Sequence, residues 1–287
     1  MKKIYSFFLI LSIGLSACKK DSRAAWLKID SVKLTTNAVT EGENSHGITD
    51  IWVYMDNEPL GVFEVPCEIP IITDEGNHHF IFYAGVNQNG INSTKIRYPF
   101  YDKVEADIVL TKEQTVNYTP NFTYKQGISF VGMENFEDTG IILQNDPNED
   151  TTTIKILSAL NYPNIVKYGN NCGHIHVSST DTIAQVFTDI ALSLPKTNIY
   201  MELDYMNNNT FAQGMITSQE ILDPYLRINA QDNATIKWKK MYINIGEQTN
   251  YLAYNSSAFN YYFVVNLDSD NAIGDIYLDN IKILYFE

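Results

Sequence analysis

Apolar and polar residues alternate along much of the first half of the chain. The pattern is clear in residues 26–34 (WLKIDSVKL), and similar runs follow at the positions 48–56, 78–86, 95–110 and 115–124. Because successive side chains of a β-strand point to opposite faces, this period of two predicts half-buried strands. Turn-rich segments such as DNEPLG and TDEGN separate the runs, and no window of a dozen residues here has helical periodicity. The first half is therefore predicted to be all-β.

Composition extends this prediction to the whole chain. The sequence has 287 residues, including 19 tyrosines, and only 19% of its residues are charged. Abundant aromatic residues and modest charge suit β-sandwiches better than helical bundles. The length exceeds one average domain and allows two domains with real cores.

The N-terminus combines positive charge, an apolar stretch and a cysteine. Lys2 and Lys3 precede an apolar run over residues 4–15, which is too short to span a bilayer and indicates a signal peptide. The sequence LSAC at residues 15–18 resembles the lipobox of bacterial lipoproteins. That resemblance implies cleavage after residue 17, acylation of Cys18 and permanent attachment to a membrane. The alternative is an ordinary secretion signal with an incidental cysteine.

Charge excludes one class of partner. Removal of residues 1–17 takes away two lysines and leaves 18 basic against 34 acidic residues, a formal charge of −16. Binding of nucleic acid requires clustered lysine and arginine, so nucleic acid is not expected as a partner. With Cys18 committed to lipid, Cys67 and Cys172 lie far apart, and both are expected to be free buried thiols.

The sequence predicts four segments along the chain. A signal peptide (1–17) and a short polar tether (18–25) precede a first β-sandwich (26–126), and a second sandwich occupies residues 127–287. The boundary is placed within YKQGISF, at Gly127. The tether reaches at most ~30 Å when extended, so the first domain is expected to lie close to the membrane.

The first domain contains a turn motif that resembles a known module. Residues 53–61 (VYMDNEPLG), the dipeptide at 65–66 (VP) and residues 76–80 (GNHHF) are similar to the PEGA domain, a small β-sandwich of bacterial envelope proteins. The resemblance implies an immunoglobulin- or PEGA-like sandwich and says nothing about a ligand.

The second half begins and ends with segments that resemble carbohydrate-binding modules. GMENFED at residues 132–138 and IYLDNIKI at 276–283 are similar to the ends of the family four and family nine modules. Residues 199–205 and 236–245 are similar to their middle strands. The resemblance covers about 155 residues and implies a galactose-binding-like jelly roll that binds glycan. It also implies a structural calcium ion between the chain ends, with Glu137, Asp138 and Asp279 as its oxygen donors. The alternative is that these carboxylates bond backbone groups at strand ends.

Strand alternation suggests where a sugar would bind. In WKKMYINI the residues Met241, Ile243 and Ile245 are expected to face the core, whereas Trp238, Lys240, Tyr242 and Asn244 point outward. In PYLRINA, Tyr225 and Arg227 are likewise expected to point outward. If both strands belong to one concave sheet, these six residues form a groove in which aromatic rings stack on sugars and polar groups bond hydroxyls. The alternative is that Trp238 caps the core at a strand end.

Two histidines invite a metal hypothesis. His174 and His176 are two residues apart on a predicted strand and therefore point to the same side. Cys172 precedes them in the same segment, but a transition-metal site needs a third and a fourth ligand. The sequence offers neither a downstream histidine nor a second nearby cysteine, so both histidines are interpreted as ordinary strand residues.

No catalytic motif is present. The sequence lacks a Gly-x-Ser-x-Gly elbow, a Gly-rich phosphate loop and a His-Glu-x-x-His motif. We therefore expect a non-catalytic protein that binds glycan, and a structural or adhesive protein whose jelly roll binds another protein is the alternative. The layout resembles surface lipoproteins of Bacteroidetes. Lys19 and Lys20, with no aspartate after Cys18, favour the outer membrane, on its periplasmic face or at the cell surface.

Overall fold

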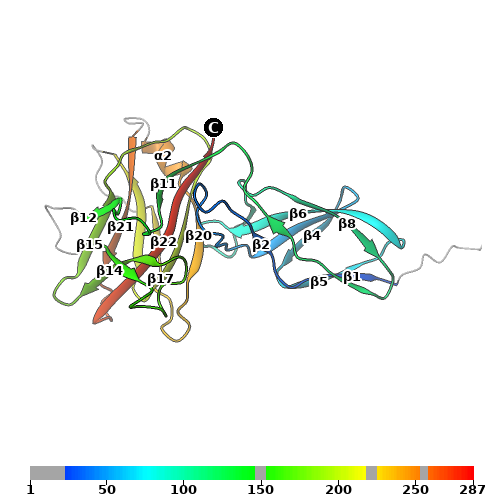
Figure 1. The fold of residues 1–287 in the computed structure, drawn as a ribbon, viewed down its shortest axis with the longest axis horizontal. Coiled ribbons are helices and arrows are strands. Elements are labelled where there is room, and N and C mark those ends of the chain that lie inside the picture. Colours follow the sequence, from blue (N-terminus) through cyan, green and yellow to red (C-terminus); the bar gives the residue numbers. More distant parts are fainter. Residues whose placement is uncertain (1–22, 146–152, 218–224, 253–257) are drawn as a thin grey trace, which may run out of the picture.

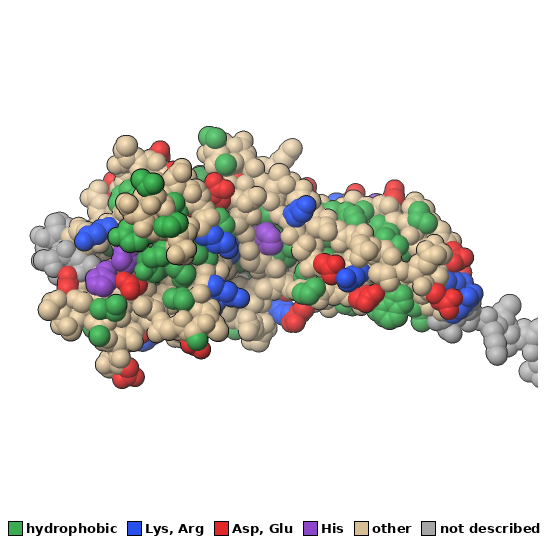
Figure 2. Space-filling view, turned by 60° about the horizontal axis from the view of Figure 1, so that its bottom comes forward, with side chains coloured by type: hydrophobic (Ala, Val, Ile, Leu, Met, Phe, Trp, Pro, Cys, Tyr) green, Lys and Arg blue, Asp and Glu red, His purple; other side chains and the backbone are tan. Residues whose placement is uncertain are grey.

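The chain folds into two β-sandwiches, and one end of the first packs against a face of the second (Figure 1). A computed structural model describes residues 23–145, 153–217, 225–252 and 258–287. The signal segment, Cys18 and most of the tether lie outside these residues. In Figure 2 the narrower first domain adjoins the bulkier second one directly.

The first domain packs one five-stranded sheet against two small sheets. The large sheet has the order β4-β3-β6-β7, with β8 also on β6, and it faces the sheets β5-β1-β9 and β10-β2. Side chains from both layers, including Leu27, Ile69, Val53 and Phe82, form one apolar core. The strands are β1 Ala25–Ile29, β2 Lys33–Leu34, β3 Asp50–Met55, β4 Glu58–Glu64, β5 Cys67–Ile71, β6 Gly76–Asn87, β7 Lys95–Arg97, β8 Val104–Leu110, β9 Thr115–Asn117 and β10 Asn121–Phe122.

A tight hairpin explains the turn motif of this domain. Asp56 and Asn57 join β3 to β4 and have φ angles of 52° and 70°. Two successive residues with positive φ are the signature of a two-residue type I′ turn, which matches the twist of the flanking strands. The turn therefore occupies the first two residues of the turn-rich segment DNEPLG (56–61) and ends before Gly61.

The second domain consists of two six-stranded sheets that face each other. The first sheet has the order β13-β14-β22-β17-β20 with β11 also on β22, and the second has the order β12-β15-β21-β18-β19 with β16 also on β21. One helix, α2 (Gly246–Leu252), covers an end of the sandwich. The strands are β11 Ile128–Glu134, β12 Leu143–Asn145, β13 Lys155–Ser158, β14 Asn171–Ser178, β15 Ile183–Thr188, β16 Leu192–Ser193, β17 Ile199–Asn207, β18 Phe211–Ile216, β19 Leu226–Ile228, β20 Lys239–Asn244, β21 Ala258–Asn266 and β22 Ile273–Phe286.

The predicted fold class is confirmed: the protein is all-β, with a β-sandwich followed by a jelly roll. No helix in the described part of the chain is long and apolar enough to cross a membrane. Cys67 and Cys172 are free thiols in different domains, and Cys172 is the fully buried one.

Strand β22 belongs to both halves of the molecule. Its residues Ile276, Leu278, Ile281 and Ile283 point into the second core, whereas Leu284 packs into the first. The first domain thus rests on the outer face of the β20-β17-β22 sheet, near the start of β11 (Figure 1). The chain crosses between the domains at Gly127, whose φ of +75° suits glycine.

Candidate functional site

The predicted face of β20 exists, but the first domain covers it. Met241 and Ile243 point into the second core as predicted, and Tyr242 points the other way. Tyr242 is only 1% exposed, and its hydroxyl accepts a 2.8 Å hydrogen bond from the Gly47 N–H. The Tyr101 hydroxyl lies 3.0 Å away. The prediction that Tyr242 belongs to an exposed sugar platform is therefore wrong.

Its neighbours on the same face are also engaged in the junction. The Lys240 side chain is 1% exposed, with its Nζ 3.5 Å from the Glu202 carboxylate. The backbone N–H of Asn244 donates to the Asn89 side chain. Trp238 precedes the strand, and its indole N–H donates a 2.6 Å bond to the Ile165 carbonyl. This ring is half-buried at a crevice between the domains, so it helps to close the sandwich edge, as in the alternative interpretation.

Tyr225 and Arg227 lie on a different sheet from β20. Arg227 is on β19, which pairs with β18 in the second sheet, whereas β20 pairs with β17 in the first. The six predicted residues therefore do not share one concave sheet. The alternation itself is correct, because Ile228 is buried and Arg227 is exposed. Tyr225 is partly buried against the second core.

A group of buried polar side chains, which we call the junction cluster, joins the two domains. It is centred on Glu202, which is 0% exposed and accepts hydrogen bonds of 2.7 and 2.8 Å from the Tyr98 and Tyr124 hydroxyls. The Nζ atoms of Lys240 and Lys282 lie 3.5 and 3.7 Å from the same carboxylate. Burial, followed by the nearby Glu202 charge, raises the pKa of both tyrosines well above its ordinary value, so their hydroxyls remain donors. The cluster therefore joins the domains through charge pairs and hydrogen bonds.

The predicted calcium ligands do not converge on one point. Glu137 accepts hydrogen bonds from the backbone N–H groups of Asn170 and Asn171. Among the described residues, Glu137, Asp138 and Asp279 are not part of any group of three acidic, histidine or cysteine side chains spaced to share an ion. The alternative interpretation of Glu137, as a carboxylate that binds backbone groups near a strand end, matches the structure.

Asp279 is buried for a different reason. It accepts a hydrogen bond from the Asn280 N–H through Oδ1, while its Oδ2 has no partner. Burial, together with the nearby Asp204 carboxylate, raises the pKa of Asp279 to about 8. The proton on this carboxyl group offsets the cost of burying it beside a second carboxylate.

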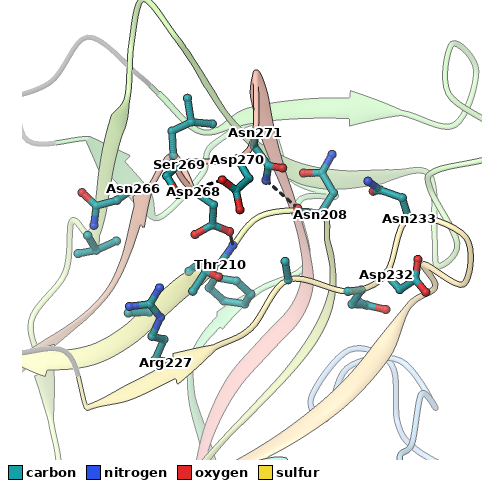
Figure 3. Close-up of a pocket in the computed structure, with 16 residues that line it drawn as sticks. Asn208, Thr210, Arg227, Asp232, Asn233, Asn266, Asp268, Ser269, Asp270 and Asn271 are labelled. Carbon is teal, nitrogen blue, oxygen red and sulfur yellow. Dashed lines mark hydrogen bonds between the residues drawn. The ribbon is translucent and has the colours of Figure 1, made fainter.

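An open cleft of the second domain lies at one end of the jelly roll (Figure 3). It encloses about 1040 Å³ and is formed by three segments that connect or extend strands: the β17–β18 connection, the segment after β19, and the β21–β22 connection. Every lining residue belongs to the second domain. They are Asn208, Thr210, Phe211, Ala212, Arg227, Ala230, Gln231, Asp232, Asn233, Val264, Asn266, Leu267, Asp268, Ser269, Asp270 and Asn271.

Two buried asparagines hold the walls of this cleft in place. The Asn209 side chain donates to the Asn266 carbonyl at 2.8 Å and accepts from the Asp268 N–H at 2.8 Å. The Asn207 amide donates to the carbonyls of Asn209 and Asn229. Both side chains are completely buried, so the three segments form one hydrogen-bonded frame. The frame fixes the neighbouring polar groups before any ligand arrives.

The open part of the cleft is polar. Asn233 offers an exposed amide group, whereas the Asn271 amide donates to the Asn208 carbonyl and to Asn209 Oδ1, and Asn208 Oδ1 accepts from the Asp275 N–H. The one aromatic lining residue, Phe211, is 1% exposed and belongs to the core, so recognition here rests on hydrogen bonds.

The charges of the cleft favour a neutral ligand. Arg227 provides donors in a fixed fork, whereas three aspartates, Asp232, Asp268 and Asp270, provide acceptors. With three carboxylates to one guanidinium, an anionic ligand would be repelled.

Sequence reasoning found only Arg227 among these residues. A signal was nevertheless present, because NNNT at 207–210, NAQDN at 229–233 and NLDSDN at 266–271 are three short segments rich in asparagine and aspartate. Residues of this kind are typical of turns, and nothing local shows that three turns meet at one end of a sandwich.

Comparison with known proteins yields only distant structural similarity. No family model matches the sequence, and no curated protein does. A carbohydrate-binding structure described as having promiscuous specificity is 13% identical, with 82% of this chain and 84% of that chain covered and a TM-score of 0.36. The K3 adhesin domain of Lys-gingipain from Porphyromonas gingivalis is 14% identical, with 55% and 99% covered and a TM-score of 0.35. The family 11 carbohydrate-binding module from Clostridium thermocellum is 14% identical, with 53% and 94% covered and a TM-score of 0.35. Scores this low carry no argument about ligand or activity, so both are argued from this chain's own residues.

Proposed function

We propose that this protein is a non-catalytic lipoprotein of a bacterial envelope that binds a neutral oligosaccharide in the cleft of its second domain. The observation that carries the proposal is the polar cleft of about 1040 Å³, lined by amides, carboxylates and one arginine. Sugar hydroxyls both donate and accept hydrogen bonds, and a preformed cavity with convergent polar groups suits such a ligand. The volume is sufficient for a short oligosaccharide.

The three carboxylates of the cleft support binding rather than hydrolysis. Asp268 Oδ2 accepts a 2.7 Å bond from the Thr210 N–H, and Asp232 Oδ1 accepts a 2.9 Å bond from the Ala234 N–H. Asp270 accepts from the Ser269 hydroxyl. Each of the three thus bonds a protein donor through one of its two oxygens, whereas a glycosidase requires two carboxylates that face the scissile bond.

Attachment through Cys18 is supported by the shape of the molecule. Strand β1, which begins at Ala25, lies at the end of the long axis far from the jelly roll (Figure 1). A chain anchored a few residues before this strand would hold the first domain at the membrane and the cleft away from it. The first domain then acts as a spacer, and the outer membrane is the proposed location.

Glycan-array binding of residues 23–287 tests the proposal. We expect Arg227→Ala to weaken binding to the selected neutral glycan by about tenfold or more, because it removes charge-assisted hydrogen bonds. Lys196→Ala is the matched control, since Lys196 is exposed on the same domain outside the cleft. Trp238→Ala should also leave binding unchanged.

Three results would contradict the proposal. Loss of binding in Trp238→Ala with retention in Arg227→Ala would move the site to the domain junction. Release of new reducing ends from a bound glycan would show a hydrolase. Absence of binding to every glycan, with capture of an envelope protein instead, would favour the structural or adhesive alternative.

A further inference from the structure

Three metal-binding side chains meet on the outer face of the jelly roll, close to the cleft. Asp275 Oδ1 lies 2.9 Å from His174 Nε2 and 2.7 Å from His176 Nδ1. The three potential ligand atoms all lie within 4.8 Å of one another. In Figure 2 histidine side chains gather on the exposed surface of the second domain.

Strand register brings the three side chains together. His174 and His176 are two residues apart on β14 and point away from the core, into which Ile175 and Val177 project. Strand β22 pairs antiparallel with β14, and its Asp275 lies directly opposite His176. Opposite residues of a strand pair share a face, so the carboxylate lies between the two rings. The third ligand that the sequence did not reveal comes from a position about 100 residues further along the chain.

The neighbours of the group hold it in position. Asp275 is fixed by Asn208, whose Oδ1 accepts a 2.6 Å bond from the Asp275 N–H and whose backbone N–H donates to the Asp275 carbonyl at 3.1 Å. The His174 ring is stacked on Tyr277, with a 4.7 Å centroid separation and an interplanar angle of 12°. The His176 side chain is 48% exposed, so one side of the group is open to solvent.

We propose that His174, His176 and Asp275 bind a divalent transition-metal ion of the Zn²⁺ class. Two imidazole nitrogens and one carboxylate oxygen are a ligand set that zinc commonly uses, with a fourth, open position for water or a ligand oxygen. Bonds of ~2.0–2.1 Å in a tetrahedron place ligand atoms ~3.4 Å apart. The present separations of 2.7 and 2.9 Å need to widen by well under 1 Å to admit the ion.

The other histidines paired with acids in this chain show what distinguishes the group. His78 lies 2.6 Å from Asp56, and His79 lies 2.9 Å from Asp107, each with one carboxylate and one ring. At Asp275 two rings contact the same oxygen, so three potential ligand atoms lie together, and this is the one such group among the described residues. The simple His–Asp pairs therefore provide a built-in comparison.

Zinc titration of residues 23–287, followed by calorimetry and by metal content after gel filtration, tests the inference. We expect one ion per chain, and Co²⁺ substitution should give the intense visible absorption of a tetrahedral site. His176→Gln and Asp275→Asn should each weaken zinc binding by more than ~100-fold, beyond the ~10–100-fold that loss of an outer partner costs. His79→Gln, which alters a simple His–Asp pair, should bind zinc as the unmodified protein does.

Absence of stoichiometric zinc in the unmodified protein would overturn the inference, as would equal losses in His79→Gln and His176→Gln. His176 is half exposed, so its replacement is expected to leave the circular dichroism spectrum unchanged and the result interpretable. The test does not depend on glycan binding. A chain that binds zinc and no glycan would uphold this site and refute the cleft.

Discussion

Two polar regions of the second domain are built from similar residue types and have opposite exposure. The junction cluster places Glu202, Lys240 and Lys282 beneath the first domain with almost no solvent contact. The cleft carries Arg227 and Asp270 in the open. In the cluster every charge has a partner of opposite sign, whereas in the cleft the buried amides form a frame and the charged groups face outward.

The contrast distinguishes polar groups that hold the fold together from polar groups that are free to bind a partner. Burial of a charge is costly unless hydrogen bonds and a counter-charge offset it, and Glu202 has two tyrosine hydroxyls and two ammonium groups. The cluster is complete without a ligand. Polar groups that remain exposed on a rigid frame are available to a partner, which is why the cleft is the proposed binding site.

Removal of the charge at the centre of the junction cluster tests whether the cluster is structural. Glu202→Gln leaves the Lys240 and Lys282 ammonium groups without their shared counter-charge, and we expect a loss of about 3–5 kcal/mol in the free energy of unfolding. Urea denaturation measures it. Glu105→Gln alters an exposed pair with Lys103 and should have no measurable effect. Equal effects of the two substitutions would show that the cluster does not fasten the domains.

A smaller change tests a single hydrogen bond across the junction. Tyr242→Phe removes the hydroxyl that accepts from the Gly47 N–H, and a buried donor without a partner costs about 1–3 kcal/mol. The expected result is lower stability with unchanged glycan affinity. A drop in glycan affinity without a drop in stability would restore Tyr242 as a ligand-binding residue.

A third test concerns the pH dependence of stability. The folded protein holds the Asp279 proton up to a pKa of about 8, whereas the unfolded chain releases it near 3.8. Between these values the folded state binds more protons, so the contribution of Asp279 to stability falls as pH rises. Asp279→Asn should flatten the curve of unfolding free energy against pH from about 4 to 8, with equal stabilities near pH 4. Parallel curves for the two proteins would contradict this expectation.

The sequence predicts correctly which face of a strand is buried in its own core, but it does not predict what packs against the other face. The alternation of Met241, Tyr242 and Ile243 identifies the core face correctly, because it depends only on the period of a strand. What lies against the opposite face depends on Gly47 and Tyr101, residues well over 100 positions earlier. No local pattern encodes such a contact.

The same limit explains why the metal group was missed. The spacing of His174 and His176 indicates that they share a side, and Asp275 joins them only through the register of β14 with β22. Sequence alone also could not separate the sheets of β19 and β20, since both strands show equivalent alternation.

The pairing of β11 with β22 has a mechanical consequence. Strand β11 leaves the first domain beside Phe286 and runs antiparallel to β22, with Ile128 opposite Phe286 and Glu134 opposite Ile281. The segment that leaves the first domain is thus bonded to the last strand of the second domain from its first residues onward. A load passed between the domains through this segment would be shared by the β11–β22 ladder and the junction cluster instead of resting on one connecting backbone.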